Sequence, residues 1–220
     1  MASSVSQLFS EQDLIRIRHA VQEAEQKTSG EIVPYVVEQS DEYERAVWRG
    51  ASIAGIVALL AFLAVYTFTG FWLPFALPVV LVVVLAAFGC GLALTHFLPP
   101  LKRFLAGRAL MQRRVGQRAA EAFVAEEVFD TRERTGILLF VSLFERQVLV
   151  VGDSGINARV KQEEWDDVVQ TIIRGIHHGS HGDGLVDAIG KCGILLERRG
   201  VERRHDDKDE LRDDLRMSDR

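Results

Sequence analysis

From Gly50 to Leu101 the chain runs for 52 consecutive residues without a single Asp, Glu, Lys or Arg. The hydrocarbon core of a bilayer is about 30 Å thick and needs about 20 apolar helical residues to cross it, so this length suffices for two crossings and a turn. A soluble domain carries charged side chains over its whole surface, which excludes a single ordinary globular fold. A hydrophobic content of 48% also excludes a wholly disordered chain.

The apolar stretch is predicted to form two membrane helices, near Arg49–Phe68 and Phe75–Phe97. The break between them falls at residues 69–74, where Gly and Pro interrupt the pattern and Trp72 suits the headgroup boundary. Pro99 and the proline after it end the second helix. The alternative is a buried helical hairpin in the core of a soluble protein.

Basic residues on both sides of this stretch predict its orientation. Cations are retained on the cytoplasmic side of a membrane, and an even number of crossings returns the chain to the side it left. We therefore expect a multi-pass protein of a bacterial inner (plasma) membrane with both termini in the cytoplasm. Residues 99–114 form a basic juxtamembrane segment that is also suited to contact anionic membrane lipids. The flanking cations are Arg45, Arg49, Lys102, Arg103, Arg108, Arg113, Arg114 and Arg118.

The charged remainder reads as alternating helices and strands. Before the apolar stretch, a helix is expected to begin at Ser10 and a strand to cover residues 31–38, with Pro34 suggesting an edge strand or an irregular one. After it, the periodicity predicts helices at 118–129, around Trp165–Ile176 and over 185–196, with strands at 137–143 and 148–151.

Neither soluble part is large enough to bury a core alone, so we expect the two to fold together. The prediction is one cytoplasmic α/β domain split between residues 10–48 and 115–200, interrupted by a transmembrane helical hairpin at 49–98. Residues 201–220 alternate acids and bases and are expected to be a solvated, mostly disordered tail.

Two groups of side chains are candidate metal ligands. Asp130 and Asp153, with Glu133 nearby, stand at the ends of predicted strands, and oxygen ligands from loops suit Ca²⁺ or Mg²⁺. The alternative for these acids is loop solvation and helix capping. A second candidate site for a transition metal lies in a predicted glycine-rich loop, where plain surface residues are the alternative. Its side chains are His177, His178, His181 and Asp183.

Other signals exclude more than they suggest. The sequence Gly152-Asp-Ser-Gly155 is better explained as a polar turn than as a nucleophile motif. Cys90 and Cys192 fall in separate parts of the predicted topology, so no disulfide is expected. A net charge of −5, with no basic surface bearing interleaved aromatic residues, argues against nucleic-acid binding.

The order of these segments resembles the TPM domain family. The likeness covers roughly residues 10–200 and includes Lys27–Val33, the run from Asp130 to Asp153, the Trp165 helix and Gly182–Ile189. It is closest to the bacterial membrane branch, in which a transmembrane hairpin interrupts the domain. Asp130 and Gly136 match the acidic loop of the family, whereas Thr135 stands where many relatives have Asn.

The resemblance implies a small α/β sandwich with a mixed sheet. Some family members are weak acid phosphatases or calcium binders, others act in membrane-protein repair or receptor assembly, and bacterial relatives are often encoded beside LemA-type membrane proteins. We therefore expect a non-catalytic protein-interaction or assembly module with a membrane-protein partner. The alternatives are a divalent-cation-dependent phosphatase and a calcium- or magnesium-binding module, both using Asp130 and Asp153.

Overall fold

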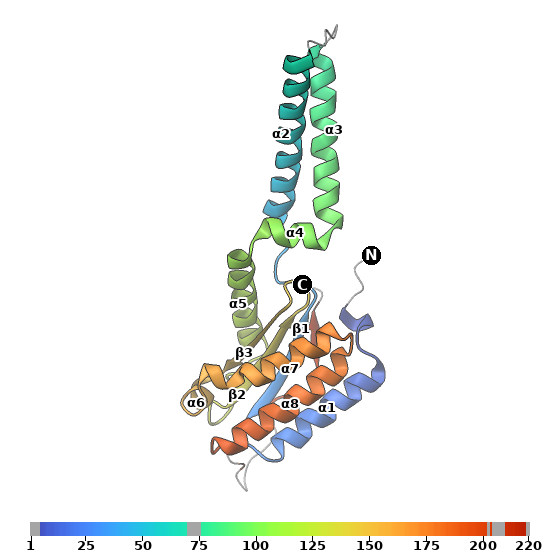
Figure 1. Cartoon of the computed structure of the whole chain (residues 1–220). Coiled ribbons are helices and arrows are strands. Elements are labelled where there is room, and N and C mark those ends of the chain that lie inside the picture. Colours follow the sequence, from blue (N-terminus) through green and yellow to red (C-terminus); the bar gives the residue numbers. More distant parts are fainter. Residues whose placement is uncertain (1–4, 70–75, 202, 204–209, 219–220) are drawn as a thin grey trace. The chain divides into compact units, whose positions relative to one another are not determined.

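The computed structural model describes residues 5–69, 76–201, 203 and 210–218. The chain divides into two compact units (Figure 1). The α/β unit consists of residues 1–40 and 113–220, and the hairpin unit consists of residues 41–112. The first unit is therefore assembled from segments on both sides of the second in the sequence.

The α/β unit is built on a four-stranded mixed sheet with the order β3-β2-β1-β4, which confirms the predicted fold class. Strand β1 (Glu31–Val37) is parallel to both of its neighbours, β2 (Gly136–Ser142) and β4 (Arg216–Ser218). Strand β3 (Gln147–Gly152) returns antiparallel to β2. The central β1–β2 pair thus joins residues more than a hundred positions apart in the chain.

Helices cover both faces of this sheet (Figure 1). On one face lie α1 (Glu11–Glu25), α7 (Asp166–His177) and α8 (His181–Arg198), which pack on alternate strand residues such as Ile32. The other alternate residues, such as Val33, pack against α5 (Arg108–Ala125). Because successive strand side chains point to opposite faces, β1 and β2 are buried along their whole length. Three short helices complete the unit: Val5–Gln7, α6 (Ser154–Asn157) and Gln162–Trp165.

Helix α1 begins where the sequence predicted. The Ser10 hydroxyl accepts a hydrogen bond from the backbone N–H of Asp13, and the Asp13 carboxylate accepts from Ser10 in return. These reciprocal bonds satisfy two donors that a helix start otherwise leaves open. The hydrogen bond from the Ser10 hydroxyl, at 2.8 Å, lowers the pKa of the Asp13 carboxyl.

The prediction that Pro34 marks an edge strand is wrong, because β1 lies between β2 and β4. The backbone N–H of Glu31 points toward β2, where it donates to the carbonyl of Thr135. Backbone groups alternate along a strand, so those of the even-numbered residues point toward β4. Pro34 therefore faces the β4 side. Strand β4 begins opposite Tyr35, one residue later, so the missing proline N–H removes no bond between strands.

The C-terminal residues are also better ordered than predicted. Instead of a solvated tail, residues 210–218 lie along the α/β unit and end in β4. Leu215 is buried in the core, and the carboxylates of Asp213 and Asp214 accept hydrogen bonds of 2.7 Å from Gln22 and Arg18 of α1. The charged composition of this segment suggested disorder, because the partners that hold its polar side chains come from distant parts of the chain and leave no signal in the local sequence.

Residues 181–184 form the first turn of α8 rather than part of a loop. Glycine occurs here because the helix packs closely on its neighbours: a Cβ atom on Gly182 would overlap Asp13 of α1. Similarly, a Cβ atom on Gly175 of α7 would lie 2.5 Å from the Cα of Gly184. The glycines therefore permit helix–helix contact, whereas their composition suggested a turn.

The hairpin unit contains α2 (Glu44–Thr69), α3 (Ala76–Phe97) and the short helix α4 (Pro99–Ala106). The first two are long and apolar enough to cross a membrane. They approach closely where Gly91 faces α2, since a Cβ atom there would lie 2.6 Å from the Cβ of Ala54. The predicted break at 69–74 falls almost wholly outside the described residues.

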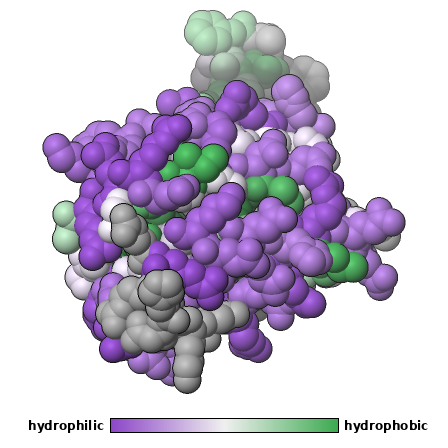
Figure 2. Space-filling model, turned by 90° about the horizontal axis from the view of Figure 1, so that it is seen from below, coloured by the Kyte–Doolittle hydropathy of each residue, from purple (hydrophilic) through white to green (hydrophobic). Residues whose placement is uncertain are grey.

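Most large apolar side chains of α2 and α3 are exposed, which argues against a buried core hairpin. By contrast, the face of the α/β unit in Figure 2 is dominated by hydrophilic residues, with apolar ones in small separate spots. The exposed side chains of the two long helices include Ile53, Ile56, Val57, Leu60, Leu63, Phe68, Leu77, Leu81, Val82 and Leu85.

Candidate functional site

The two edges of the parallel strand pair carry different polar groups. Asp130 precedes β2, and Asp153 follows β3, whose last residue Gly152 pairs with Ile137 near the start of β2. Both carboxylates therefore lie at the end of the sheet where the parallel strands β1 and β2 begin, which we call the amino edge; the opposite end is the carboxyl edge. Ligands in α/β sheets bind outside the carboxyl ends of the strands, so the positional reason for a cation site at Asp130 and Asp153 does not hold. Asp153 lies at this edge because β3 runs antiparallel to β2 and so ends where β2 begins.

Asp153 has a structural role at this edge. Its carboxylate accepts a 2.6 Å hydrogen bond from the backbone N–H of Ser154 and caps the single turn of α6. Its other oxygen lies 2.9 Å from the Arg134 guanidinium, an ion-pair contact. The Arg134 side chain also covers the Phe129 ring, and its backbone carbonyl accepts from the N–H of Gly155. Asp153 thus joins the loop before β2 to the end of β3.

Asp130 is exposed, and its backbone N–H bonds the carbonyl of Glu127. Within residues 5–69, 76–201, 203 and 210–218, no three or more His, Cys, Asp or Glu side chains are grouped so that they could hold a metal ion. Binding of Ca²⁺ or Mg²⁺ at Asp130 and Asp153 stays a prediction. It would require Asp153 to exchange Arg134 for the cation.

The carboxyl edge holds a buried polar cluster that the sequence did not reveal. Ser142 is the last residue of β2, and its hydroxyl donates to the Glu145 carboxylate. The same carboxylate accepts the backbone N–H of Ser40 at 2.9 Å, and the Ser40 and Ser142 hydroxyl oxygens are 2.9 Å apart. Ser142 is 0% and Glu145 5% exposed. We call these three residues the edge cluster.

The edge cluster has a structural role and is not a reactive centre. A serine beside a carboxylate suggests a nucleophile and a base, but both side chains are closed off from solvent and therefore from a substrate. Its bonds tie Ser40, the last residue before the hairpin unit, to the turn between β2 and β3. Only the pairing of β1 with β2 brings Ser40 and Glu145 together, so spacing in the sequence carries no signal for it.

Replacement of Glu145 by Ala is expected to destabilise the α/β unit by about 2–3 kcal/mol, because the Ser40 N–H and Ser142 hydroxyl would each lose a buried acceptor. Glu145→Gln, which retains one amide oxygen, should lose less. Denaturant unfolding of the full chain in detergent, followed by circular dichroism, measures both. Glu163→Ala, at an exposed acid, is the matched control and should stay within about 0.5 kcal/mol of the wild type. An equal loss in Glu163→Ala and Glu145→Ala would contradict this role.

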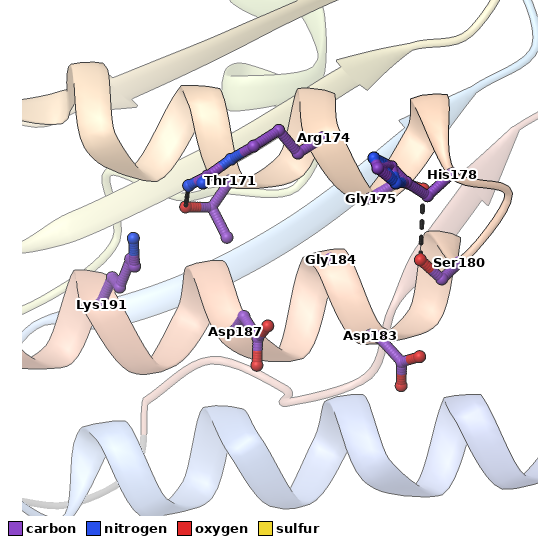
Figure 3. Close-up of a pocket in the computed structure, with 9 residues that line it drawn as sticks. All are labelled: Thr171, Arg174, Gly175, His178, Ser180, Asp183, Gly184, Asp187 and Lys191. Atoms are coloured by element: carbon purple, nitrogen blue, oxygen red, sulfur yellow. Dashed lines mark hydrogen bonds between the residues drawn. The ribbon is translucent and has the colours of Figure 1, made fainter.

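A groove of about 480 Å³ lies between α7 and α8 (Figure 3). The Gly175–Gly184 contact forms its floor, since neither residue fills the space between the helices. Arg174 lies along the groove in Figure 3 and donates to the Thr171 hydroxyl at 3.2 Å. The lining residues are Thr171, Arg174, Gly175, His178, Ser180, Asp183, Gly184, Asp187 and Lys191.

Charges of both signs line this α7–α8 groove, and several are held in surface pairs. Lys191 donates to Asp167 at 2.8 Å, and this hydrogen bond lowers the pKa of the Asp167 carboxyl. Asp183 pairs with Arg16 of α1 at 2.7 Å. Fixed charges of mixed sign on two rigid helices suit the recognition of a polar protein surface. Cys192 in the core beneath is buried, which raises the pKa of its thiol and leaves it inert.

The four residues of the predicted histidine site do not share one position. His177 ends α7 and is exposed, and His178 follows it at the rim of the groove. His181 begins α8, and its ring packs edge-on against Phe9, 6.2 Å between centroids. Asp183 is engaged by Arg16. The groove itself was missed because Arg174 and Lys191 come from different helices and meet only in the packed structure.

The chain is similar in fold to one solved structure, the NMR structure of the BA42 protein from the psychrophilic bacterium Bizionia argentinensis. The TM-score is 0.59 at 19% sequence identity, and the match covers 99% of this chain and 100% of that one. At this identity the likeness shows the fold alone. No protein-family model and no curated protein matches the sequence.

Proposed function

We propose that this chain is a membrane-anchored TPM-like domain that acts as a non-catalytic protein-interaction or assembly module at the inner face of a bacterial plasma membrane. The observation that carries the proposal is the parallel pairing of β1 with β2 across the inserted hairpin unit. A single folded sheet lies on one side of a membrane, so the segment between its two strands must leave and return on that side. Two apolar helices meet this requirement.

The cations at the base of the hairpin support a cytoplasmic position for the α/β unit. Arg45 and Arg49 precede the apolar part of α2, and Lys102 and Arg103 follow α3, with no acidic residue from Arg45 to Ala120. Segments rich in Lys and Arg stay on the cytoplasmic side during insertion.

The α7–α8 groove is the surface that suits a partner. It is concave, charged and built on helices anchored in the core through Ile172 and Ile189. A LemA-type membrane protein is the partner that the family resemblance suggests. In the edge cluster, the Ser142 hydroxyl and the Glu145 carboxylate are buried, which favours binding over catalysis.

Co-purification tests the proposal. The full chain and a LemA-type protein, produced together in a bacterium and extracted with mild detergent, should elute as one complex. Arg174→Glu with Asp187→Arg, in the groove, should lower recovery of the partner at least tenfold. The control Arg159→Glu with Glu163→Arg, also exposed, should leave it unchanged. Recovery of this chain alone, or turnover of a phosphate ester abolished by Asp130→Ala, would overturn the proposal in favour of another partner or of a phosphatase.

Cysteine labelling tests the topology separately. In a Cys90→Ala background, Phe68→Cys at the end of α2 is expected to react with a membrane-impermeant maleimide added to intact cells (spheroplasts where an outer membrane is present). Lys161→Cys in the α/β unit should react only after permeabilisation. Buried Cys192 should stay unlabelled in both cases. Labelling of Lys161→Cys from outside would place the α/β unit on the opposite side of the membrane.

A further inference from the structure

Helix α4 forms a separate face at the base of the two long helices of the hairpin unit. It follows α3 after one residue, begins with two prolines that suit a first helical turn, and contacts both α2 and α3. Ala106 is buried, and the carbonyl of Leu105 accepts a hydrogen bond from Arg49 of α2 at 3.2 Å. One side of α4 is therefore anchored to the hairpin.

Large apolar side chains remain exposed on and beside this helix. Phe104 of α4 is 81% exposed, Phe97 at the end of α3 is 76% exposed, and Leu98 between the helices is 46% exposed. Water is a poor environment for two phenylalanine rings at this exposure. Apolar side chains of an interfacial helix instead enter the boundary between headgroups and acyl chains.

Cations accompany these apolar residues. Lys102 and Arg103 belong to α4, and Arg108 follows it after Gly107. Helix α4 itself contains no acidic residue. A phenylalanine-bearing helix with cations and no acids is complementary to a surface that is apolar inside and negatively charged outside, which describes a leaflet containing anionic phospholipid.

We infer that α4 is an interfacial helix that binds the phosphate headgroups of anionic phospholipids through Lys102, Arg103 and Arg108, while Phe97, Leu98 and Phe104 enter the acyl-chain boundary. This inference rests on the proposal that α2 and α3 span the membrane. It adds a lipid-binding surface with a stated preference, whereas membrane anchoring requires only apolar length. The long stems of Lys and Arg allow their charged ends to reach the headgroups while the rings lie deeper.

Lipid retention tests the headgroup contact. The full chain is reconstituted in vesicles of phosphatidylcholine and phosphatidylglycerol, extracted in mild detergent, and its bound lipids are counted by mass spectrometry. Wild type should retain phosphatidylglycerol above its share in the vesicle, because each cation near the surface raises the affinity for the anionic lipid about fivefold. The triple variant Lys102→Gln/Arg103→Gln/Arg108→Gln should retain the two lipids in the bulk ratio. The matched control, Arg159→Gln/Lys161→Gln/Arg198→Gln in the α/β unit, should behave as wild type.

A probe at Phe104 tests the depth of the helix. Phe104→Cys in the Cys90→Ala background, labelled with an environment-sensitive fluorophore, should show blue-shifted emission in vesicles that brominated lipid quenches. The same label at Arg159→Cys should report water and escape quenching. Both labelled variants must retain the circular dichroism spectrum of the parent, which excludes misfolding.

The outcomes separate the two proposals. A wild-type chain that fails to associate with vesicles would overturn membrane anchoring. A wild-type chain that inserts but retains lipids in the bulk ratio would overturn the role of α4 alone. A loss of the phosphatidylglycerol preference in the α/β-unit control that equals the loss in the triple variant would do the same. A water-like, unquenched label at Phe104 would do the same for the insertion of its ring.

Discussion

Replacement of residues 41–112 by a flexible Gly/Ser linker of about twelve residues is expected to move this protein from the membrane fraction to the soluble fraction with its sheet intact. The α/β unit holds its own core on both faces of the sheet. Its strands β1 and β2 pair along seven residues, from Glu31 opposite Gly136 to Val37 opposite Ser142. The entropic cost of closing a flexible connection depends only weakly on its length, so a linker of this length should join the two segments without a large loss of stability.

Ultracentrifugation of cell extracts and circular dichroism of the purified product measure this change. The full chain should sediment with membranes almost completely, whereas the linked variant should stay in the supernatant and unfold cooperatively on heating. Val36→Asp, which places a charge at a position 1% exposed, is the control that should abolish cooperative unfolding. A linked variant that stays with the membrane, or is soluble without cooperative unfolding, would show that the two segments do not form a self-sufficient domain.

Truncation after Arg203 should lower the free energy of unfolding by about 3–5 kcal/mol, the equivalent of losing two well-buried aliphatic side chains. The lost segment contributes buried Leu215 and the pairing of β4 with β1. It also supplies the backbone N–H groups of Glu210 and Leu211, which lie 3.4 and 3.3 Å from the carboxylate oxygens of Glu31. Glu31 is 5% exposed, so a buried charge would lose donors.

Denaturant titration of the full and truncated chains in the same detergent gives this difference. A chain with Gly and Ser at positions 204–209, which retains residues 210–218, is the control and should unfold near the wild-type midpoint. An unchanged midpoint after truncation would mean that the C-terminal segment does not stabilise the α/β unit in solution. Leu215→Ala should reproduce about half of the truncation effect.

Local pattern was sufficient for the elements that are long and periodic. The long apolar stretch predicted α2 and α3, the Ser10 cap predicted the start of α1, and the apolar runs predicted β1, β2 and β3 within about a residue. The interpretation failed where a partner distant in the sequence decides the outcome. Pro34 is acceptable in an inner strand because β4 is short. Glycine stands at position 182, within a helix, because a Cβ atom there would overlap Asp13.

The candidate site divides in the same way. Asp153 and the histidines are visible in the sequence as polar residues in turns, but the cap on α6, the Arg134 pair and the Phe9 contact depend on packing. The edge cluster joins Ser40 to Glu145, and the α7–α8 groove places Arg174 near Lys191. None of these pairs has a spacing that a periodic pattern could mark.

Residue order alone therefore predicted the solvent that each part of the chain prefers, because transfer of apolar or charged side chains between water and lipid depends on composition over some twenty positions. It also established most helices and strands, since their hydrogen bonds and side-chain periods are local. Strand order, the C-terminal β4, the edge cluster and the groove emerged from the folded chain. They depend on which surfaces meet, and long-range contacts between hydrogen-bonding and apolar groups settle that choice only when the whole core forms.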